Sequence, residues 1–187
     1  NIRQPNKDQM FTLSILGEHL HTMGNILKNN NNNNKHKKEI NQEFFMIHGG
    51  PGVGKTWLIN RIVDLMEIEG VGVASSAFTG VAAAGIKNAK TISGLFRIPV
   101  PRKGEQQNKQ LDLLSFDYRQ SLINYFKNID AIIIDEISFV ASHTLGTIDE
   151  RCKEAKENQL PFGGMTVIVA GDFFSYHLLE EVHYIKK

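Results

Sequence analysis

The sequence lacks the features that mark secreted and membrane proteins. Among its 187 residues there is one cysteine, Cys152, which excludes an intramolecular disulfide and favours a reducing compartment. No apolar run approaches the roughly 20 residues of a membrane span, and the first residues lack the apolar core of a signal peptide. We therefore expect an intracellular protein with no membrane partner, and we interpret Cys152 as an ordinary helix residue.

An excess of charge is also missing. Lys and Arg number 21 against 20 Asp and Glu, so the net charge is near +1 and the overall composition does not indicate a nucleic-acid partner. A site for such a partner must then be a local patch. The length suits one ordinary α/β domain with its own core and is too short for two such domains with insertions.

The strongest pattern in the chain is a glycine-rich loop. Residues 49–56 read GGPGVGKT and match G-x-x-x-x-G-K-[ST], between a short apolar run at Phe44–Ile47, expected to be a buried strand, and a segment with helical spacing. The glycines let backbone N–H groups converge on phosphates, and we expect Lys55 to contact the β- and γ-phosphates and Thr56 to hold Mg²⁺. The full pattern favours nucleotide binding over a glycine turn with one surface lysine. The residues expected to contact the nucleotide in and beside this loop are Gly50, Gly52, Val53, Gly54, Lys55, Thr56 and Trp57.

Strands and helices alternate along the chain, and each strand ends in polar residues. The expected strands are Phe44–Ile47, Val71–Ala77, Ala131–Ile134 and Thr166–Ala170, and the expected helices are Asn6–Leu27, Val81–Ile86, Leu111–Phe126 and Ala141–Glu157. This order is typical of an α/β fold with a mainly parallel sheet flanked by helices and a ligand at the carboxyl edge.

The chain divides at a run of asparagines. Residues 29–34 are all asparagine and a basic cluster follows, so we predict a solvated loop in preference to a nucleic-acid contact. We therefore divide the chain into an N-terminal helix at 1–28, a low-complexity Asn/Lys loop at 29–40 and a nucleotide-binding lobe at 41–187. The first helix is expected to begin at Asn6, with Gln9 completing a capping box.

A second chemical motif follows the expected strand at 131–134. The segment IIIDE, residues 132–136, has the form of a Walker B strand, whose acids serve the metal and the attacking water in phosphoryl transfer. We assign Asp135 to Mg²⁺ and Glu136 to the attacking water. Two solvated acids at a strand end are the alternative, but the pairing with GGPGVGKT favours NTP hydrolysis.

Five blocks together resemble the petite-integration-frequency (Pif) DNA helicases of superfamily one and the helicase domains of rolling-circle transposons. They are the adenine-reading glutamine motif at Asn6–Gln9, the GGPGVGKT loop, AFTGVAAAGI with TISGLFRIP at 77–86 and 91–99, IIIDEIS, and PFGG followed by VIVAGDF. The resemblance implies a RecA-like P-loop NTPase lobe and ATP-dependent 5′-to-3′ unwinding of DNA in repair, recombination and telomere maintenance. It also implies residence in the nucleus or the mitochondrion.

The resemblance also implies site residues. Gln9 would read adenine, Lys55, Asp135 and Glu136 would run the hydrolysis of ATP, and Asp172 would lie beside the nucleotide. Thr79, Gly80 and Phe96 are candidates for a single-stranded DNA track, where an aromatic ring can stack on any base. Packing of Phe96 in the core is an equal alternative.

Three departures from the family pattern limit what we expect. Residues 174–179, FSYHLL, replace the expected glutamine and proline-rich segment of the third motif, and Ser93 and Gly94 stand where histidine and serine are usual. The second RecA-like lobe, with its arginine fingers, is absent from these residues, so we expect this chain alone not to be a working motor. The alternatives are a degenerate ATP-binding module with an interaction or regulatory role and, with less support, an unrelated small-molecule NTPase.

Overall fold

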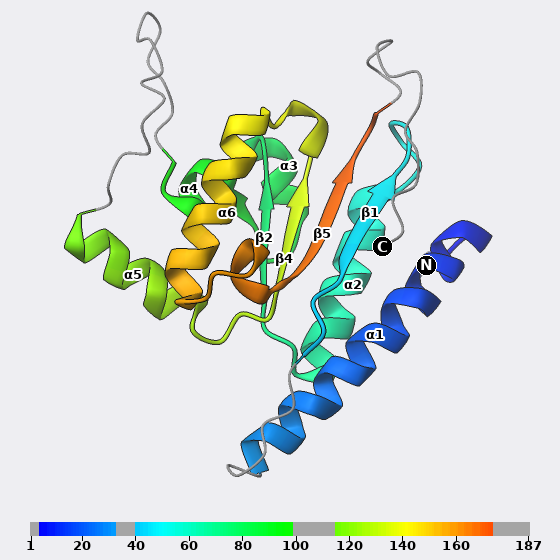
Figure 1. Ribbon diagram of the computed structural model, residues 1–187. Coiled ribbons are helices and arrows are strands. Elements are labelled where there is room, and N and C mark those ends of the chain that lie inside the picture. Colours follow the sequence, from blue (N-terminus) through cyan, green and yellow to red (C-terminus); the bar gives the residue numbers. More distant parts are fainter. Residues whose placement is uncertain (1–3, 33–39, 99–114, 174–187) are drawn as a thin grey trace, which may run out of the picture.

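A parallel five-stranded sheet lies between two layers of helices (Figure 1). The computed structural model describes residues 4–32, 40–98 and 115–173. The strand order is β1-β5-β4-β2-β3, and every neighbouring pair is parallel. The strands are β1 (Phe44–His48), β2 (Val73–Ala77), β3 (Lys90–Thr91), β4 (Ala131–Asp135) and β5 (Thr166–Gly171). The predicted parallel α/β fold is confirmed.

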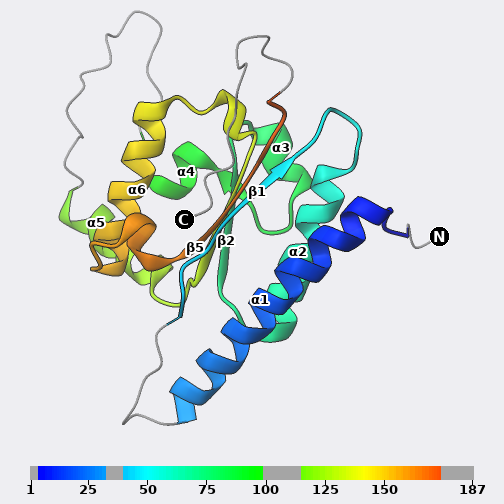
Figure 2. The same ribbon diagram turned by 45° about the vertical axis from the view of Figure 1, so that its right-hand side comes forward.

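Helix α1 precedes the first strand, and the other helices lie in the connections between successive strands, as parallel pairing requires. The α-helices are α1 (Lys7–Asn32), α2 (Lys55–Glu69), α3 (Gly80–Gly85), α4 (Ile92–Phe96), α5 (Phe116–Phe126) and α6 (Ser142–Lys156), and the 3₁₀ turns are η1 (Ile137–Phe139) and η2 (Pro161–Gly164). Figures 1 and 2 show α1 lying along α2 on one face of the sheet, while α4, α5 and α6 cover the other. None of the helices in the described ranges is long and apolar enough to cross a bilayer.

Two separate cores hold the layers together, and β4 contributes to both. Alternate side chains of a strand point to opposite faces, so Ile133 packs toward α1 and α2 while Ile132 and Ile134 pack toward α5 and α6. All three are 0% exposed. Such an uninterrupted apolar strand is typical of a parallel sheet covered on both faces.

The first strand differs from the sequence prediction. We predicted a buried strand at Phe44–Ile47, but β1 lies at the edge of the described sheet, and Phe44 and Met46 are 56% and 61% exposed. Only Phe45 and Ile47 turn toward the core under α1 and α2. The apolar run could not reveal this difference, because an edge strand and a central strand can share the same composition.

Helix α1 begins where we predicted and ends later. The Asn6 side chain accepts a hydrogen bond from the Gln9 N–H at 2.8 Å, and Gln9 Oε1 accepts one from the Asn6 N–H at 3.1 Å, which confirms the capping box. The helix then continues through Asn32, so the boundary that we placed at residue 29 is wrong. Extending a formed helix needs no new nucleus, and asparagine is only mildly unfavourable within it. The rest of the predicted loop, residues 33–39, lies outside the described residues.

The remaining predicted elements agree with the structure within a few residues. Helix α5 is described from Phe116, whereas the prediction began at 111, and 111–114 lie outside the described residues. The Ser115 hydroxyl caps this helix. The two-residue strand β3 was not predicted as a strand, because a pair of residues carries no alternation to detect. Cys152 is confirmed as a helix residue, and it lies buried in α6.

Candidate nucleotide and DNA site

The glycine-rich loop connects β1 to α2 at the carboxyl edge of the sheet. The Gly49 N–H donates to the Gly171 carbonyl at 3.4 Å, which ties the loop to the end of β5. Gly54 has φ 92°, a conformation that side-chain-bearing residues rarely adopt. A Cβ added at Gly49 would lie 2.9 Å from Val53 Cγ2. The backbone conformation therefore favours glycine at position 54, and a side chain at position 49 would require Val53 to shift.

The start of α2 is suited to an anion. Gly54 is its N-cap and has no side chain to accept from the first N–H groups of this 15-residue helix. The Lys55 ammonium folds back over the loop, where it donates to the carbonyls of Gly49 and, at 2.8 Å, Gly50. The donors predicted to contact phosphate are thus gathered in one place.

Gln9 reaches this loop from the first turn of α1. Its Nε2 donates to the Val53 carbonyl at 3.1 Å, while its Oε1 completes the capping box. The side chain is 6% exposed and ties the N-terminus of α1 to the phosphate loop. Adenine recognition by Gln9 stays a prediction. Trp57, on the first turn of α2, packs partly buried against the core beneath α1.

The two acids of the IIIDE segment differ sharply in environment. Asp135 is the last residue of β4, is 5% exposed, and accepts a hydrogen bond from the Glu136 N–H at 2.8 Å. Burial raises the pKa of Asp135, and the charge of Lys55 opposes that rise. Glu136 begins the next turn with φ 58°, which turns the chain away from the strand direction. The metal role of Asp135 and the water role of Glu136 stay predictions.

The Glu136 carboxylate is held by the connection between β2 and α3. Both the N–H and the hydroxyl of Thr79 donate to Glu136 Oε2, at 2.9 and 2.8 Å. The Thr79 hydroxyl also accepts from the Ala82 N–H at 3.2 Å and so caps α3. Thr79 and Gly80 are exposed, as residues of a nucleic-acid track must be. The sequence placed Thr79 and Glu136 in separate motifs and did not predict this contact.

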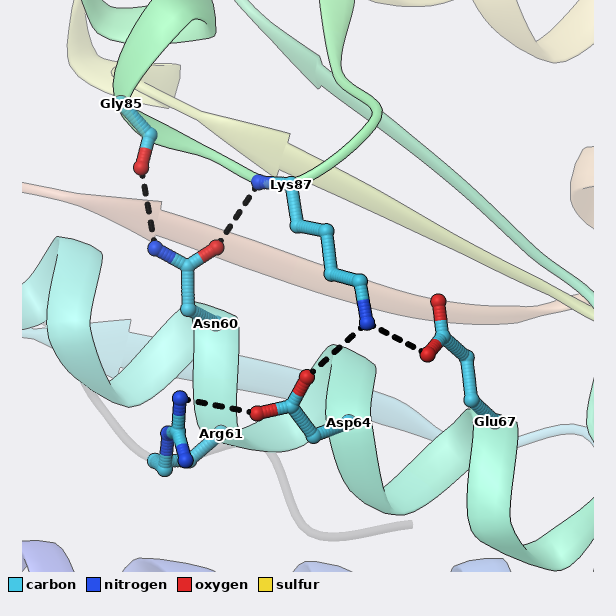
Figure 3. A network of polar contacts seen from close by, with 6 residues as sticks. All are labelled: Asn60, Arg61, Asp64, Glu67, Gly85 and Lys87. Carbon is cyan, nitrogen blue, oxygen red and sulfur yellow. Dashed lines mark hydrogen bonds and ion pairs between the residues drawn. The ribbon is translucent and has the colours of Figure 1, made fainter.

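A polar network fixes α3 to the helix that follows the phosphate loop (Figure 3). Asn60 of α2 donates to the Gly85 carbonyl at 2.9 Å and accepts from the Lys87 N–H at 2.8 Å. The Lys87 ammonium pairs with Asp64 at 3.2 Å and with Glu67, both on α2. The end of α3 and the residues that follow it are therefore tied to the helix after the phosphate loop.

Phe96 does not belong to the surface of this site. It is 0% exposed and stacks on Phe126 of α5, with ring centroids 5.9 Å apart. Its predicted role as a stacking surface for DNA is therefore wrong, and the alternative of core packing is the one observed. Helical spacing in the short block TISGLF could not reveal on which side of α4 the ring lies.

A different aromatic pair is exposed at the carboxyl edge. Phe78, directly after β2, and Phe139, in η1 after β4, are 47% and 53% exposed and stack with centroids 5.9 Å apart and planes 24° apart. We did not single out either residue from the sequence. The sequence did carry a signal for this pair, because each of two strands is followed within a few residues by an aromatic residue and the two strand ends meet at one edge of the sheet.

The third motif is described only at its start. Asp172 follows β5 at the same edge as the phosphate loop and is half-buried. The altered residues 174–179 lie outside the described residues. Ser93 and Gly94 lie on α4. The Gly94 N–H donates to Oγ1 of Thr91, the N-cap of this helix, at 3.1 Å.

This arrangement matches a known family along most of the chain. A family model described as PIF1-like helicase matches residues 25–178. An ATP-dependent DNA helicase Pif1 of Psychrobacter is 32% identical over 126 residues, which cover 67% of this chain and 18% of the relative. The chain thus spans under a fifth of that relative's length.

Solved structures of helicases share the fold. The crystal structure of the Candida albicans Pif1 helicase covers 92% of this chain with a TM-score of 0.65 at 22% identity, and 33% of that protein is matched. A Bacteroides Pif1 helicase in complex with ADP-AlF3 and single-stranded DNA covers 84% of this chain with a TM-score of 0.58 at 28% identity, and 32% of that protein is matched. The family model, the relative and the fold agree. The chain belongs to the PIF1-like helicase family.

Proposed function

We propose that this chain is the first RecA-like motor lobe of an ATP-dependent DNA helicase, which binds Mg-ATP at the carboxyl edge of its sheet and single-stranded DNA beside it. The observation that carries the proposal is the convergence of the phosphate loop, Asp135, Glu136 and Thr79 on that one edge. The Psychrobacter relative is an ATP-dependent DNA helicase, and the Bacteroides structure holds an ATP analogue with single-stranded DNA.

The residues present fit a magnesium nucleotide. The uncapped N-terminus of α2 and the Lys55 ammonium suit phosphates, and the Thr56 hydroxyl with the Asp135 carboxylate are hard oxygen donors of the kind Mg²⁺ prefers. When bound, Mg²⁺ neutralises the charge that develops on the transferred phosphoryl group. Asp135 and Thr56 would hold the ion, Lys55 would hold the phosphates, and Glu136 would orient the attacking water.

Strand binding is supported by the chemistry of the exposed edge. Thr79 and Gly80 offer hydroxyl and backbone donors for phosphates, and the Phe78–Phe139 pair offers an aromatic surface on which bases can stack without sequence preference. Unwinding polarity, roles in repair, recombination and telomere maintenance, and nuclear or mitochondrial residence stay predictions from the family resemblance.

Two titrations test this function and separate it from a degenerate ATP-binding module. Labelled Mg-ATP should bind, Lys55→Ala should weaken it by about 100-fold or more because the phosphates lose their cation, and Lys127→Ala should not. A fluorescent oligo-dT should bind with an affinity that falls steeply as salt rises. ATP binding without DNA binding favours the degenerate module, and unchanged ATP affinity in Lys55→Ala removes the phosphate-loop assignment.

A further inference from the structure

The contact between Thr79 and Glu136 joins the two halves of the proposed site. Glu136 Oε2 accepts from the Thr79 N–H at 2.9 Å and from the Thr79 hydroxyl at 2.8 Å. One carboxylate oxygen thus accepts two hydrogen bonds from a single residue, Thr79, which lies between β2 and α3. Charge-assisted bonds of this kind are among the stronger hydrogen bonds in proteins.

The Thr79 hydroxyl has no hydrogen left for a second acceptor. A hydroxyl donates once, and this one donates to Glu136 while it accepts from the Ala82 N–H. A phosphate oxygen that accepts a hydrogen bond from the Thr79 hydroxyl must therefore replace Glu136 as its acceptor. Thr79 is exposed, so the exchange needs no rearrangement of the core.

The surroundings favour movement of the glutamate side chain over movement of Thr79. Helix α3 is fixed to α2 by Asn60 and Lys87, as Figure 3 shows, and a Cβ at Gly85 would already lie 3.2 Å from Thr56 Cγ2. Glu136 instead extends from a turn at the end of β4 and is half-buried. The carboxylate is the partner that can rotate when the shared hydrogen bond is lost.

We propose that Thr79 is a positioning residue that holds the Glu136 carboxylate by two hydrogen bonds while single-stranded DNA is absent, and by the N–H bond alone when a DNA phosphate takes the Thr79 hydroxyl. This inference rests on the proposed function, because it needs DNA at Thr79 and a role for Glu136 in hydrolysis. With one donor fewer, the carboxylate can turn toward the attacking water and orient it. Strand binding is then coupled directly to ATP hydrolysis, with no need for a change of fold.

A double-mutant cycle on the full chain tests the shared hydrogen bond by DNA affinity alone. Glu136→Ala removes the competing acceptor, so oligo-dT should bind about 5–10-fold more tightly. In the Thr79→Val background the same change should give less than about a twofold gain. Loss of charge repulsion alone predicts equal gains in both backgrounds, and equal gains would overturn the proposal. No oligo-dT binding by the unmodified chain would remove the proposed function as well, so the two failures are distinguishable.

Hydrolysis gives a second readout that a structural role would not move. Thr79→Val should raise the kcat for ATP without DNA and lower its stimulation by oligo-dT several-fold, with the KM for ATP unchanged, and Thr79→Ser should restore both. Ser115→Ala, which removes the capping hydroxyl of α5, is the control for loss of a helix cap and should change neither value. A Thr79→Val protein with unchanged stimulation contradicts the positioning role. The binding cycle decides the question where turnover is too slow to measure.

Discussion

The middle of β4 and its carboxyl end are adjacent in sequence and differ in almost every physical respect. Residues Ala131–Ile134 are 0% exposed and contribute to the cores on both faces of the sheet. The next two residues are acids, one with a pKa raised by burial and one with a positive φ. The strand interior stabilises the fold, and its end holds groups whose burial or conformation disfavours folding. Function and stability should therefore respond to different substitutions along one strand.

The largest effect is expected at the end of the strand. Glu136→Gln keeps the shape of the side chain and removes the carboxylate that orients water, so single-turnover hydrolysis of ATP should fall by about 10²–10⁴-fold. The midpoint of thermal unfolding should stay within about 1 °C of the unmodified chain, because the glutamine oxygen can still accept the two hydrogen bonds from Thr79. A large loss of stability in Glu136→Gln would break the distinction between the two parts of β4.

The next largest effect is expected in the strand interior. Ile133→Ala removes buried methyl groups between the sheet and α2, and should lower the free energy of unfolding by about 2–5 kcal/mol in urea denaturation. Met46→Ala, at an exposed position of β1, is the matched control and should cost about 0.5 kcal/mol or less. Equal losses in the two variants would show that β1 is covered in solution.

A smaller effect is expected where α2 meets α3. Asn60→Ala removes two hydrogen bonds to backbone groups of the α3–β3 connection, and should cost about 1–2 kcal/mol of unfolding free energy. Lys87→Met removes only the exposed ion pairs of the same network and should cost less than Asn60→Ala, because solvent screens such pairs. The opposite order would mean that the ion pairs, and not the amide, hold the two helices together.

The smallest effect concerns a histidine away from the nucleotide edge. Burial lowers the pKa of His19 below its ordinary value of 6.5, with Glu43 opposing. The folded state thus disfavours the protonated form, so stability should decline as the pH falls through 6.5 toward the lowered pKa. His19→Gln should reduce the change in the thermal unfolding midpoint between about pH 7 and pH 5. His143→Gln, at an exposed position, should leave that change as it is. A profile unaltered in His19→Gln excludes this contribution.

The sequence predicted the parts of the fold that have a repeating or stereochemical signal. The four longer strands and the capping box of α1 follow from patterns within a few residues. The exposure of individual side chains did not follow from such patterns. Phe96, a candidate for an exposed DNA contact, lies in the core, whereas Phe44, predicted in a buried strand, lies exposed at the sheet edge. Which side of a short element faces solvent depends on strand order, and strand order is set by pairing between distant segments.

The candidate site shows the same division. Lys55, Asp135 and Glu136 were found from motifs because each motif is local and its chemistry needs those residue types. The contact from Thr79 to Glu136 and the Phe78–Phe139 pair join β2 to β4, which are neighbours in the sheet and separated by α3, β3, α4 and α5 in the chain. No local pattern signals a contact across such a separation.

The position of β1 also orders the folding of the chain. Among the described strands β1 pairs only with β5, so Phe44 finds its partner at Val167, near the other end of the described chain. Closing so long a loop is slow, and β2 and β4 can pair before it closes. During synthesis the glycine loop leaves the ribosome before β2, β4 and β5, yet its strand gains a neighbour only after β5 has emerged. Nucleotide-binding competence should therefore be acquired late, after the opposite half of the sheet has formed.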